Sequence, residues 1–340
     1  MTGATLPVLP TEGDRASVSG IDRVFDGTSP IFVVGAPRSG TTLLRVMLSS
    51  HSRIYIPPES DFIPRLFRRH AQVLMSPKQA ARNLRIVLGY RRFFREWRAT
   101  PLDPASFTAG LSHLTPAAFL NALYSAYADQ YGAARWGDKS PIYTRYVDLL
   151  AEIFPAAQFV HLIRDGRDAA LSALAAYRDR PYVDIYFGAR TWRERVQAAH
   201  GAGLALGSKR YLEVRYEDLT TDPQAVLREL CEFLGETYEP AMCEPHKLGK
   251  ELLRPRGRHA PVRQPLRPNS GRWRREMSPT DQRLVTAVAG ELLQELRYDV
   301  VDLGEMPASE RVRVARLATK YRMLEGGRRV LQALGVFPPH

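Results

Sequence analysis

The chain has 340 residues, of which 44% are hydrophobic and 25% are charged, and its net charge at neutral pH is +12. These fractions are ordinary for a globular protein, so they exclude a wholly disordered chain, a collagen-like chain and a disulfide scaffold. The basic excess, carried mostly by arginine, indicates an anionic partner: nucleic acid, a membrane surface or a phosphate-bearing small molecule.

The N-terminal part of the chain predicts a flexible segment followed by two short strands. Residues 1–28, rich in Thr, Ser, Gly and Pro, are expected to form a flexible lead-in. Residues 31–34 are β-branched or aromatic and predict a strand that is buried on both faces. A helix is expected over 42–50. Residues 53–56 predict a second strand, which two prolines end.

The middle of the chain alternates between strand and helix patterns. Residues 61–98 are basic and of helical composition, and residues 117–131 predict an amphipathic helix. Two strand–helix units follow: residues 158–163 with a helix over 166–177, and residues 211–214 with a helix over 223–235. This alternation predicts an α/β fold with a central parallel sheet that is flanked by helices.

The C-terminal third interrupts this alternation. Residues 245–275 are rich in proline and arginine, and we expect a long basic loop with a function. Helices are expected over 279–298 and over 309–335. No internal linker is evident, so the prediction is one domain over 29–300 and a helical extension over 301–340.

The most specific motif is GAPRSGTT, residues 35–42, between the first strand and the first helix. Two glycines five residues apart let successive N–H groups point at one anion, at a helix N-terminus that favours negative charge. The spacing matches the P-loop pattern GxxxxGK[ST], except that Thr41 stands at the lysine position and Arg38 supplies a cation within the loop. The alternative is a turn that only caps a helix.

The missing lysine bears on the type of reaction. ATP-dependent phosphoryl transfer uses Mg²⁺, held by the loop Ser/Thr and by an aspartate at a strand end. The nearest such residue is Asp165, and its neighbours Arg164 and Arg167 make a poor setting for another cation. A sulfuryl group carries one negative charge less than a phosphoryl group, so arginine, lysine and backbone dipoles suffice to bind it. We therefore expect no metal site.

A second anion site is indicated at the end of the strand over 158–163. Arg164 stands at the carboxyl end of this strand, where ligands of open α/β sheets bind. Ser172 follows two helical turns later and offers a hydroxyl group to the same anion. The alternative is an ordinary ion-paired start of a helix.

Four segments together resemble the sulfotransferases that use 3′-phosphoadenosine 5′-phosphosulfate (PAPS), over roughly residues 30–298: GAPRSGTT, HLIRDGRDAALS, VRYEDL and SGRW. The resemblance implies PAPS as the donor and 3′,5′-ADP as the product. It assigns the 5′-phosphosulfate to Arg38, Ser39, Gly40, Thr41 and Thr42, and the 3′-phosphate to Arg164 and Ser172. It places Tyr216 near the adenine, and Ser270, Gly271, Arg272 and Trp273 over the 3′-phosphate or the base.

The resemblance also implies a general base and a catalytic lysine. Glu59 in IPPESDFIP resembles the base of the tyrosylprotein branch, whereas the cytosolic small-molecule branch uses His, for which His51 and His113 are candidates. Glu59 also has the spacing of the ribose-binding acid of dinucleotide folds, although the loop is not GxGxxG. Lys139 in WGDKSP resembles the lysine that binds the leaving oxygen; the alternative is a surface turn formed by Asp138 and Lys139.

The predicted function is therefore PAPS-dependent sulfuryl transfer to a hydroxyl group, with Glu59 as base and with Arg38 and Lys139 stabilising charge. A Mg²⁺-dependent P-loop kinase or nucleotide hydrolase is the second hypothesis, and a nucleic-acid-binding protein is the third. The acceptor stays open: it could be a small molecule, glycan, lipid, polyketide or protein tyrosine. No nucleic acid partner is expected for the protein, and its oligomeric state is undetermined. Residues 61–131 are expected to build its pocket.

The cysteine content and the hydropathy pattern indicate a compartment. Cys231 and Cys243 are the only two cysteines, and their spacing fits neither a metal site nor a disulfide framework. The first twenty residues lack a signal-peptide pattern, and no apolar run reaches the ~18 residues of a spanning helix. We expect a cytoplasmic protein without stable membrane insertion.

Overall fold

The computed structural model describes residues 29–68, 71–89, 102–111, 113–180, 182–253 and 259–333. The expected lead-in over 1–28 and the end of the expected helical stretch over 61–98 lie outside these residues. The first half contains β1 (Ile31–Val34), α1 (Thr41–Ser49), β2 (Ile54–Tyr55), α2 (Ile63–Phe67), α3 (Pro77–Leu88), α5 (Pro104–Ala109), α6 (Pro116–Ala128), η1 (Asp129–Tyr131), β3 (Arg135–Lys139), η2 (Pro141–Arg145), α7 (Val147–Ile153) and β4 (Gln158–Ile163). The second half contains α8 (Gly166–Ala176), α9 (Ile185–Leu206), β5 (Tyr211–Arg215), α10 (Tyr216–Thr221), α11 (Pro223–Leu234), η3 (Pro240–Cys243), α12 (Pro245–Leu252), η4 (Ala260–Arg263), α13 (Trp273–Glu276), α14 (Pro279–Glu295) and α15 (Ala308–Ala333).

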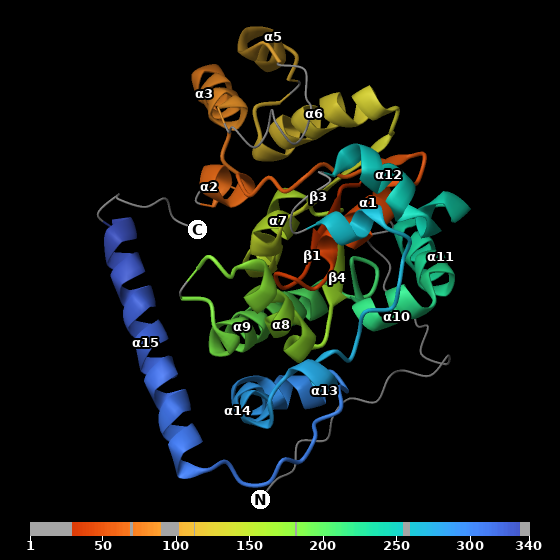
Figure 1. Ribbon diagram of the computed structural model, residues 1–340. Helices are drawn as coiled ribbons and strands as arrows, with labels where there is room; N and C mark the ends of the chain where they lie inside the picture. The colour runs from red at the N-terminus through yellow and green to blue at the C-terminus, as the bar shows by residue number, and fades with distance from the viewer. Residues whose placement is uncertain are drawn as a thin grey trace, which may run out of the picture.

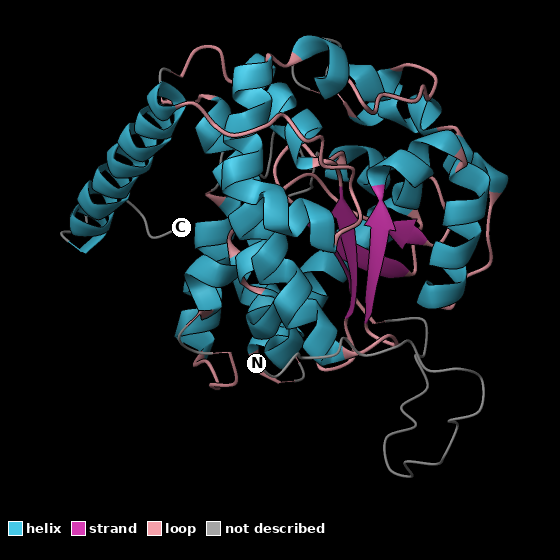
Figure 2. Cartoon of the chain, turned by 90° about the horizontal axis from the view of Figure 1, so that it is seen from below, coloured by secondary structure: helices cyan, strands magenta, loops and turns pink. Residues whose placement is uncertain are grey.

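A five-stranded parallel sheet forms the centre, with the strand order β2-β3-β1-β4-β5. The central strand β1 places Phe32 beside Asp138 of β3 and beside Phe159 of β4. Every residue of β1, β3 and β4 is buried, as expected for parallel strands covered on both faces. Figure 2 shows the strands surrounded by helices. The predicted α/β fold with a central parallel sheet flanked by helices is confirmed.

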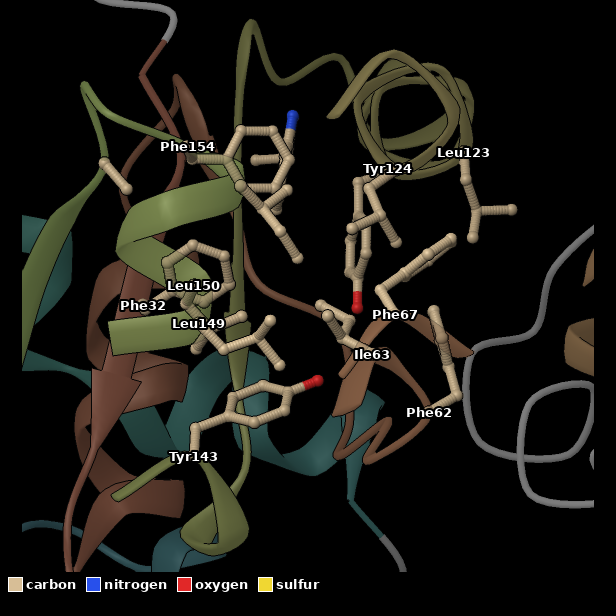
Figure 3. Close-up of a cluster of buried hydrophobic side chains, with 14 of the residues drawn as sticks. Phe32, Phe62, Ile63, Phe67, Leu123, Tyr124, Tyr143, Leu149, Leu150 and Phe154 are labelled. Carbon is tan, nitrogen blue, oxygen red and sulfur yellow. The ribbon is translucent and has the colours of Figure 1, made fainter. Parts of the chain in front are cut away.

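The two faces of the sheet pack against different helices because side chains alternate along a strand. Phe32 and Phe159 face a cluster with α6 and α7, whose aromatic and leucine side chains Figure 3 shows around Phe32. Ile31, Val33 and Val160 face the opposite cluster, formed with α1 and α11. A third cluster joins α8, α9 and α14. In Figure 1, α7, α8 and α9 lie on one side of the strands and α1, α10 and α11 on the other.

The strand order creates a crevice at the centre of the sheet. The chain leaves β1 toward the edge strand β2, whereas it leaves β4 toward the opposite edge strand β5. The connections that follow the adjacent strands β1 and β4 therefore diverge at their carboxyl ends, and ligands of open α/β sheets bind at such a point. GAPRSGTT follows β1, and Arg164 follows β4.

The strand β3 was not predicted, and the alternative of a surface turn at Asp138 and Lys139 is wrong. Arg135–Lys139 lies between β2 and β1. Its polar residues hide the pattern of a buried strand, because their partners come from remote segments. Arg135 is fully buried and donates hydrogen bonds to Ser29 O, Leu234 O and Gln158 Oε1 at 2.6–2.7 Å.

The long basic loop expected over 245–275 is partly wrong. Its first eight residues form the helix α12, which packs against α1 and η4, and its end contains α13. The close approach of α12 and η4 requires a glycine, because a Cβ on Gly249 would lie 2.8 Å from Val262 O. The long C-terminal helix was expected and is α15, which runs along the outside of the body (Figure 1). Within the described part of the chain, no helix has the length and apolar character needed to cross a membrane.

Candidate active site

A cavity of about 800 Å³ opens at the carboxyl ends of β1 and β4. Its wall combines residues from the loop after β1, the ends of β2 and β3, helices α8 and α10, and the segment before α13. The lining residues include Arg38, Gly40, Thr41, Thr42, Glu59, Asp61, Ser140, Arg164, Ser172, Tyr177, Tyr216, His259, Asn269 and Arg272. This volume is in the range of small-molecule sites.

The loop between β1 and α1 has the backbone of an anion cradle. Gly40, with φ 96°, caps α1 in the left-handed region, and Arg38 adopts φ 71°. A Cβ on Gly40 would lie 2.5 Å from Cδ2 of Tyr216, so only glycine lets this ring rest against the loop. The loop is therefore shaped both for an anion and for the aromatic ring beside it.

Polar groups at this loop lack protein partners. The hydroxyl of the fully buried Ser39 and Nε of the buried Arg164 have no hydrogen bond within the described structure. The helix α1 that begins here has neither a side-chain cap nor an acidic residue in its first turn. Buried polar groups ordinarily have partners, and a helix N-terminus favours negative charge. Of these groups, the first residues of α1 and Arg164 line the cavity, whereas Ser39 does not.

The two predicted anion-binding motifs meet in space. Arg38 Nε donates a hydrogen bond to Ser172 Oγ at 3.3 Å, and Arg164 Nη1 donates one to Arg38 O at 3.4 Å. The guanidinium of Arg164 also lies 4.4 Å from the centre of the Tyr216 ring. Residues from the loop, α8 and α10 thus surround one space.

The SGRW segment is only partly at the cavity. Arg272 lines the cavity and pairs with Glu276, whereas Ser270 is exposed and, like Gly271, does not line it. Trp273 is 3% exposed, lies 3.5 Å beneath the guanidinium of Arg167 and packs in the core. The structure therefore places Trp273 as a core residue rather than above a ligand.

Glu59 lines the same cavity and forms an ion pair with Lys139, which is buried and does not line the cavity itself. Lys139 Nζ lies 2.5 Å from Glu59 Oε1 and 3.3 Å from Thr42 Oγ1, so the ammonium lies between the carboxylate and the anion loop. Lys139 is 2% exposed. Burial lowers the pKa of Lys139, Arg45 adds to this effect, and the nearby Glu59 opposes it. The Glu59 carboxylate can accept a proton, and it lies next to the buried ammonium of Lys139.

The two histidines considered as alternative bases do not lie in this cavity. His51 lies beyond the C-terminal end of α1, where Nε2 donates to Thr237 O at 2.8 Å and Nδ1 accepts from the backbone N–H of Arg53. It lines a separate cavity of about 310 Å³. His113 is exposed between α5 and α6 and does not line the main cavity. Neither histidine supports the alternative of a histidine base in this cavity.

The strand-end aspartate that a magnesium site would use is already occupied by a cation. Asp165 caps α8 and accepts two hydrogen bonds from the Arg167 guanidinium at 2.7–2.9 Å. Among the residues that the structure describes, no group of three His, Cys, Asp or Glu side chains is arranged to hold a metal ion.

Sequence reasoning did not single out several residues of the wall, among them Tyr177, His259 and Asn269, and of the segment 61–131, which was expected to build the acceptor pocket, Asp61 alone is among the described residues that line this cavity. Desolvation by the surrounding protein and the charge of Lys139 lower the pKa of His259 to about 4, although the residue as a whole is exposed. Asp61 has a left-handed backbone with φ 61°. No motif marks His259; the available signal was the unusual composition of residues 245–275, which contain it.

Comparison with known proteins identifies related sequences. The profile of the sulfotransferase family matches residues 30–240. Protein-tyrosine sulfotransferase A of Caenorhabditis elegans is 27% identical over 236 residues, which are 68% of this chain and 57% of that protein. The Drosophila melanogaster protein-tyrosine sulfotransferase is 26% identical over 62% of this chain and 39% of its own length. The chain thus spans about half the length of these relatives.

Solved structures show the same architecture. The sulfotransferase domain of the Synechococcus PCC 7002 olefin synthase has a TM-score of 0.58 and 26% identity, over 81% of this chain and 98% of that domain. The sulfotransferase domain from the curacin biosynthetic pathway has a TM-score of 0.54 and 22% identity, over 81% and 99% respectively, and supports the fold.

Proposed function

This chain belongs to the sulfotransferase family, and from that premise we propose that it moves a sulfuryl group from PAPS to a hydroxyl group of an acceptor. One observation carries the proposal. One cavity is lined by residues of the loop over 35–42, by Arg164 and Ser172 and by Glu59, whose ion-pair partner Lys139 is buried next to it. Two anion-binding sets next to a proton acceptor suit a donor with separate phosphate groups.

The residues fit this donor. The first N–H groups of α1 would hold the 5′-phosphosulfate, with Arg38, Gly40, Thr41 and Thr42, which all line the cavity, whereas the Ser39 hydroxyl is buried outside its wall. Arg164 and Ser172 would hold the 3′-phosphate, and Tyr216, which lines the cavity beside Gly40 and Arg164, would contact the adenine. Arg272 stands at the same wall.

The side chains divide the reaction between them. The donor supplies an activated sulfur: the acceptor oxygen bonds to it as the bond from sulfur to the phosphate oxygen breaks, which releases 3′,5′-ADP. Glu59 accepts the hydroxyl proton of the acceptor. Lys139, which contacts both Glu59 and Thr42, stabilises the charge that develops on the departing oxygen, together with Arg38 and the loop N–H groups.

The acceptor is proposed by class only. The related proteins are named for protein tyrosine and for an olefin synthase, so an aromatic or an aliphatic hydroxyl group is the acceptor to test first. Incubation with ³⁵S-labelled PAPS and, in parallel, a tyrosine peptide, a 3-hydroxyacyl thioester and 2-naphthol measures transfer to each class.

The donor assignment is tested by calorimetry with 3′,5′-ADP and AMP. Because the proposal assigns Arg164 and Ser172 to the 3′-phosphate, which AMP lacks, 3′,5′-ADP should bind at least about tenfold more tightly than AMP, as expected for the loss of one or more charge-assisted hydrogen bonds. In Arg164→Gln this preference should shrink while AMP binding changes little. Equal affinity of the wild-type protein for both nucleotides contradicts the proposal.

A further inference from the structure

A buried carboxylate lies directly behind the Glu59–Lys139 pair. Asp138 is fully buried in β3, and its Oδ2 accepts hydrogen bonds from the hydroxyls of Ser60, Tyr124 and Tyr143 at 2.5–2.6 Å. Figure 3 shows the Tyr124 and Tyr143 hydroxyls turned toward one another, the first from α6 and the second from the segment after β3. We call these four residues the Asp138 cage.

Hydrogen bonds satisfy the buried carboxylate oxygens of Asp138. Burial raises the pKa of Asp138, and the three hydroxyls and the backbone N–H of Lys139 act against that rise. Burial also raises the pKa of Tyr124 and Tyr143 well above the usual value, so both remain hydrogen-bond donors. A buried charge is tolerated when its lone pairs are all used, and a network of this kind fixes its members in one arrangement.

Two members of the cage adjoin the two proposed catalytic residues in the chain. Ser60 follows Glu59, and Asp138 precedes Lys139, whose backbone N–H donates to Asp138 Oδ1 at 2.7 Å. Because side chains alternate along a strand, Asp138 points toward α6 while Lys139 points toward the anion loop, where it reaches Thr42. The cage therefore connects both sides of the ion pair from outside the cavity.

The Glu59 segment depends on contacts of this kind. Between Tyr55 and Ile63 the chain belongs to no helix or strand. Asp61, within this stretch, has φ 61°, a conformation that a non-glycine residue keeps only when its surroundings hold it. The buried Ser60 hydroxyl, which also lies 2.7 Å from Tyr143 Oη, is a fixed point in the stretch.

We propose that the Asp138 cage is a positioning device that holds Glu59 against Lys139, with Ser60 as its link to the base. This inference rests on the proposed function. Placement of a catalytic group within a fraction of an ångström has a large effect on rate, since a misplacement of ~1 Å can cost about 10²-fold. The four cage residues do not line the cavity; they act through their chain neighbours.

The test uses Ser60→Ala, Tyr124→Phe and Tyr143→Phe, with Tyr211→Phe as the matched control. Tyr211 is also a buried tyrosine whose hydroxyl donates to a carboxylate, Glu213 at 2.6 Å, but it lies on β5 and does not line the cavity. For each variant we would measure kcat with 2-naphthol and labelled PAPS, the Kd of 3′,5′-ADP, and the melting temperature. A crystal structure of Ser60→Ala gives the distance from Glu59 to Lys139 directly.

We expect kcat of Ser60→Ala to fall roughly 10- to 100-fold, with the Kd of 3′,5′-ADP within about twofold of wild type. Tyr124→Phe and Tyr143→Phe should fall less, and Tyr211→Phe should keep kcat despite a comparable loss of melting temperature. In a Glu59→Gln background, Ser60→Ala should have little further effect, because the residue acts through Glu59.

An unchanged kcat in Ser60→Ala overturns the proposal, as does an equal loss of kcat in Tyr211→Phe or full additivity with Glu59→Gln. So does a Ser60→Ala crystal structure in which Glu59 Oε1 stays within hydrogen-bond distance of Lys139 Nζ. A wild-type protein that neither binds 3′,5′-ADP nor transfers label contradicts the proposed function instead, and the crystal structure then still decides whether the cage positions the pair.

Discussion

Lys139 is the residue through which the proposed base and the anion loop are connected. Its ammonium contacts Glu59, 80 positions earlier in the chain, and Thr42 at the start of α1. Burial lowers its pKa, and the adjacent Glu59 acts against that change. In the proposed reaction, a protonated amine here would have two roles: it would pair with the carboxylate before reaction and stabilise negative charge at the loop during reaction.

Glu59→Gln tests the proposed base. The amide keeps the size of the side chain but cannot accept the proton of the acceptor, so kcat should fall by about 10²–10⁴-fold, the usual contribution of a general base. Binding of 3′,5′-ADP, measured by calorimetry, should change little.

Glu239→Gln is the matched control for this substitution, because Glu239 binds Ser52 outside the cavity. It should retain wild-type turnover. If Glu59→Gln keeps its kcat, the base is another residue, and His259 is the first to examine because it lines the same cavity. If 3′,5′-ADP affinity falls together with turnover, Glu59 binds the nucleotide instead.

At the scale of elements, the loop between β1 and α1 depends on close contact with α10. Gly40→Ala would place a methyl group about 2.5 Å from the Tyr216 ring, at a φ of 96° that is itself unfavourable for alanine. Either the ring or the loop must move. We expect the affinity for 3′,5′-ADP, measured by calorimetry, to fall roughly tenfold or more, because several charge-assisted hydrogen bonds are misaligned together.

Gly235→Ala is the control for Gly40→Ala, because it strains the backbone in the same way but creates no steric contact. Gly235 ends α11 with φ 72°, and a Cβ there would meet no atom within 4 Å. This variant should lose stability in thermal unfolding but keep its nucleotide affinity. An equal loss of affinity in both glycine variants would mean that general destabilisation, and not the Tyr216 contact, explains the effect.

The attachment of β5 to β4 and α9 predicts a pH-dependent stability. Glu213 of β5 accepts hydrogen bonds from Tyr211 at 2.6 Å and from His200 of α9 at 2.7 Å, and lies 3.5 Å from His161 of β4. Burial opposes its ionisation, but the bonds from His161, Tyr211 and His200 outweigh burial and lower the pKa of Glu213 to about 2.

Glu213→Gln should therefore destabilise the protein at neutral pH. A carboxyl group whose pKa is lower in the folded state stabilises the fold above its unfolded pKa, and this contribution is lost as the pH falls toward the folded value. We expect a loss of about 2 kcal/mol at pH 7, allowing for partial exposure, that shrinks between pH 5 and pH 2. Urea unfolding of both proteins across this range measures it; a difference that does not depend on pH contradicts the assignment.

At the scale of the whole molecule, the sheet order determines where distant segments meet. The divergence of the chain after β1 and β4 brings the loop, Arg164 and Ser172 to one crevice, while β2 and β3 deliver Glu59 and Lys139 from one side. Arginine side chains from several elements thus line the cavity, Lys139 is buried next to it, and Asp165, the strand-end acid, is bound by Arg167.

This distribution of charge predicts that the transfer reaction does not require a metal ion. Turnover of labelled PAPS with 2-naphthol should be unchanged, within about twofold, after dialysis against EDTA, since side-chain cations and backbone dipoles provide the stabilisation. Loss of activity on chelation that Mg²⁺ restores, together with turnover of ATP, would instead support a P-loop kinase or nucleotide hydrolase.

The sequence by itself determined the features that depend on local chemistry. The strand–helix alternation, the glycine spacing of residues 35–42 and Arg164 at a strand end indicated the α/β fold and two anion-binding motifs, because periodicity and turn geometry are properties of neighbouring residues. The same information suggested Glu59 and Lys139 through a resemblance.

Only the tertiary structure decided how distant residues combine. β3 is a central strand although its residues are polar, because Ser29, Gln158 and other remote groups satisfy Arg135. Trp273 lies in the core and His259 in the cavity wall, although no local pattern distinguishes their roles. Burial and hydrogen-bond satisfaction are set by segments that lie far apart in the chain, so the sequence pattern around a residue cannot reveal them.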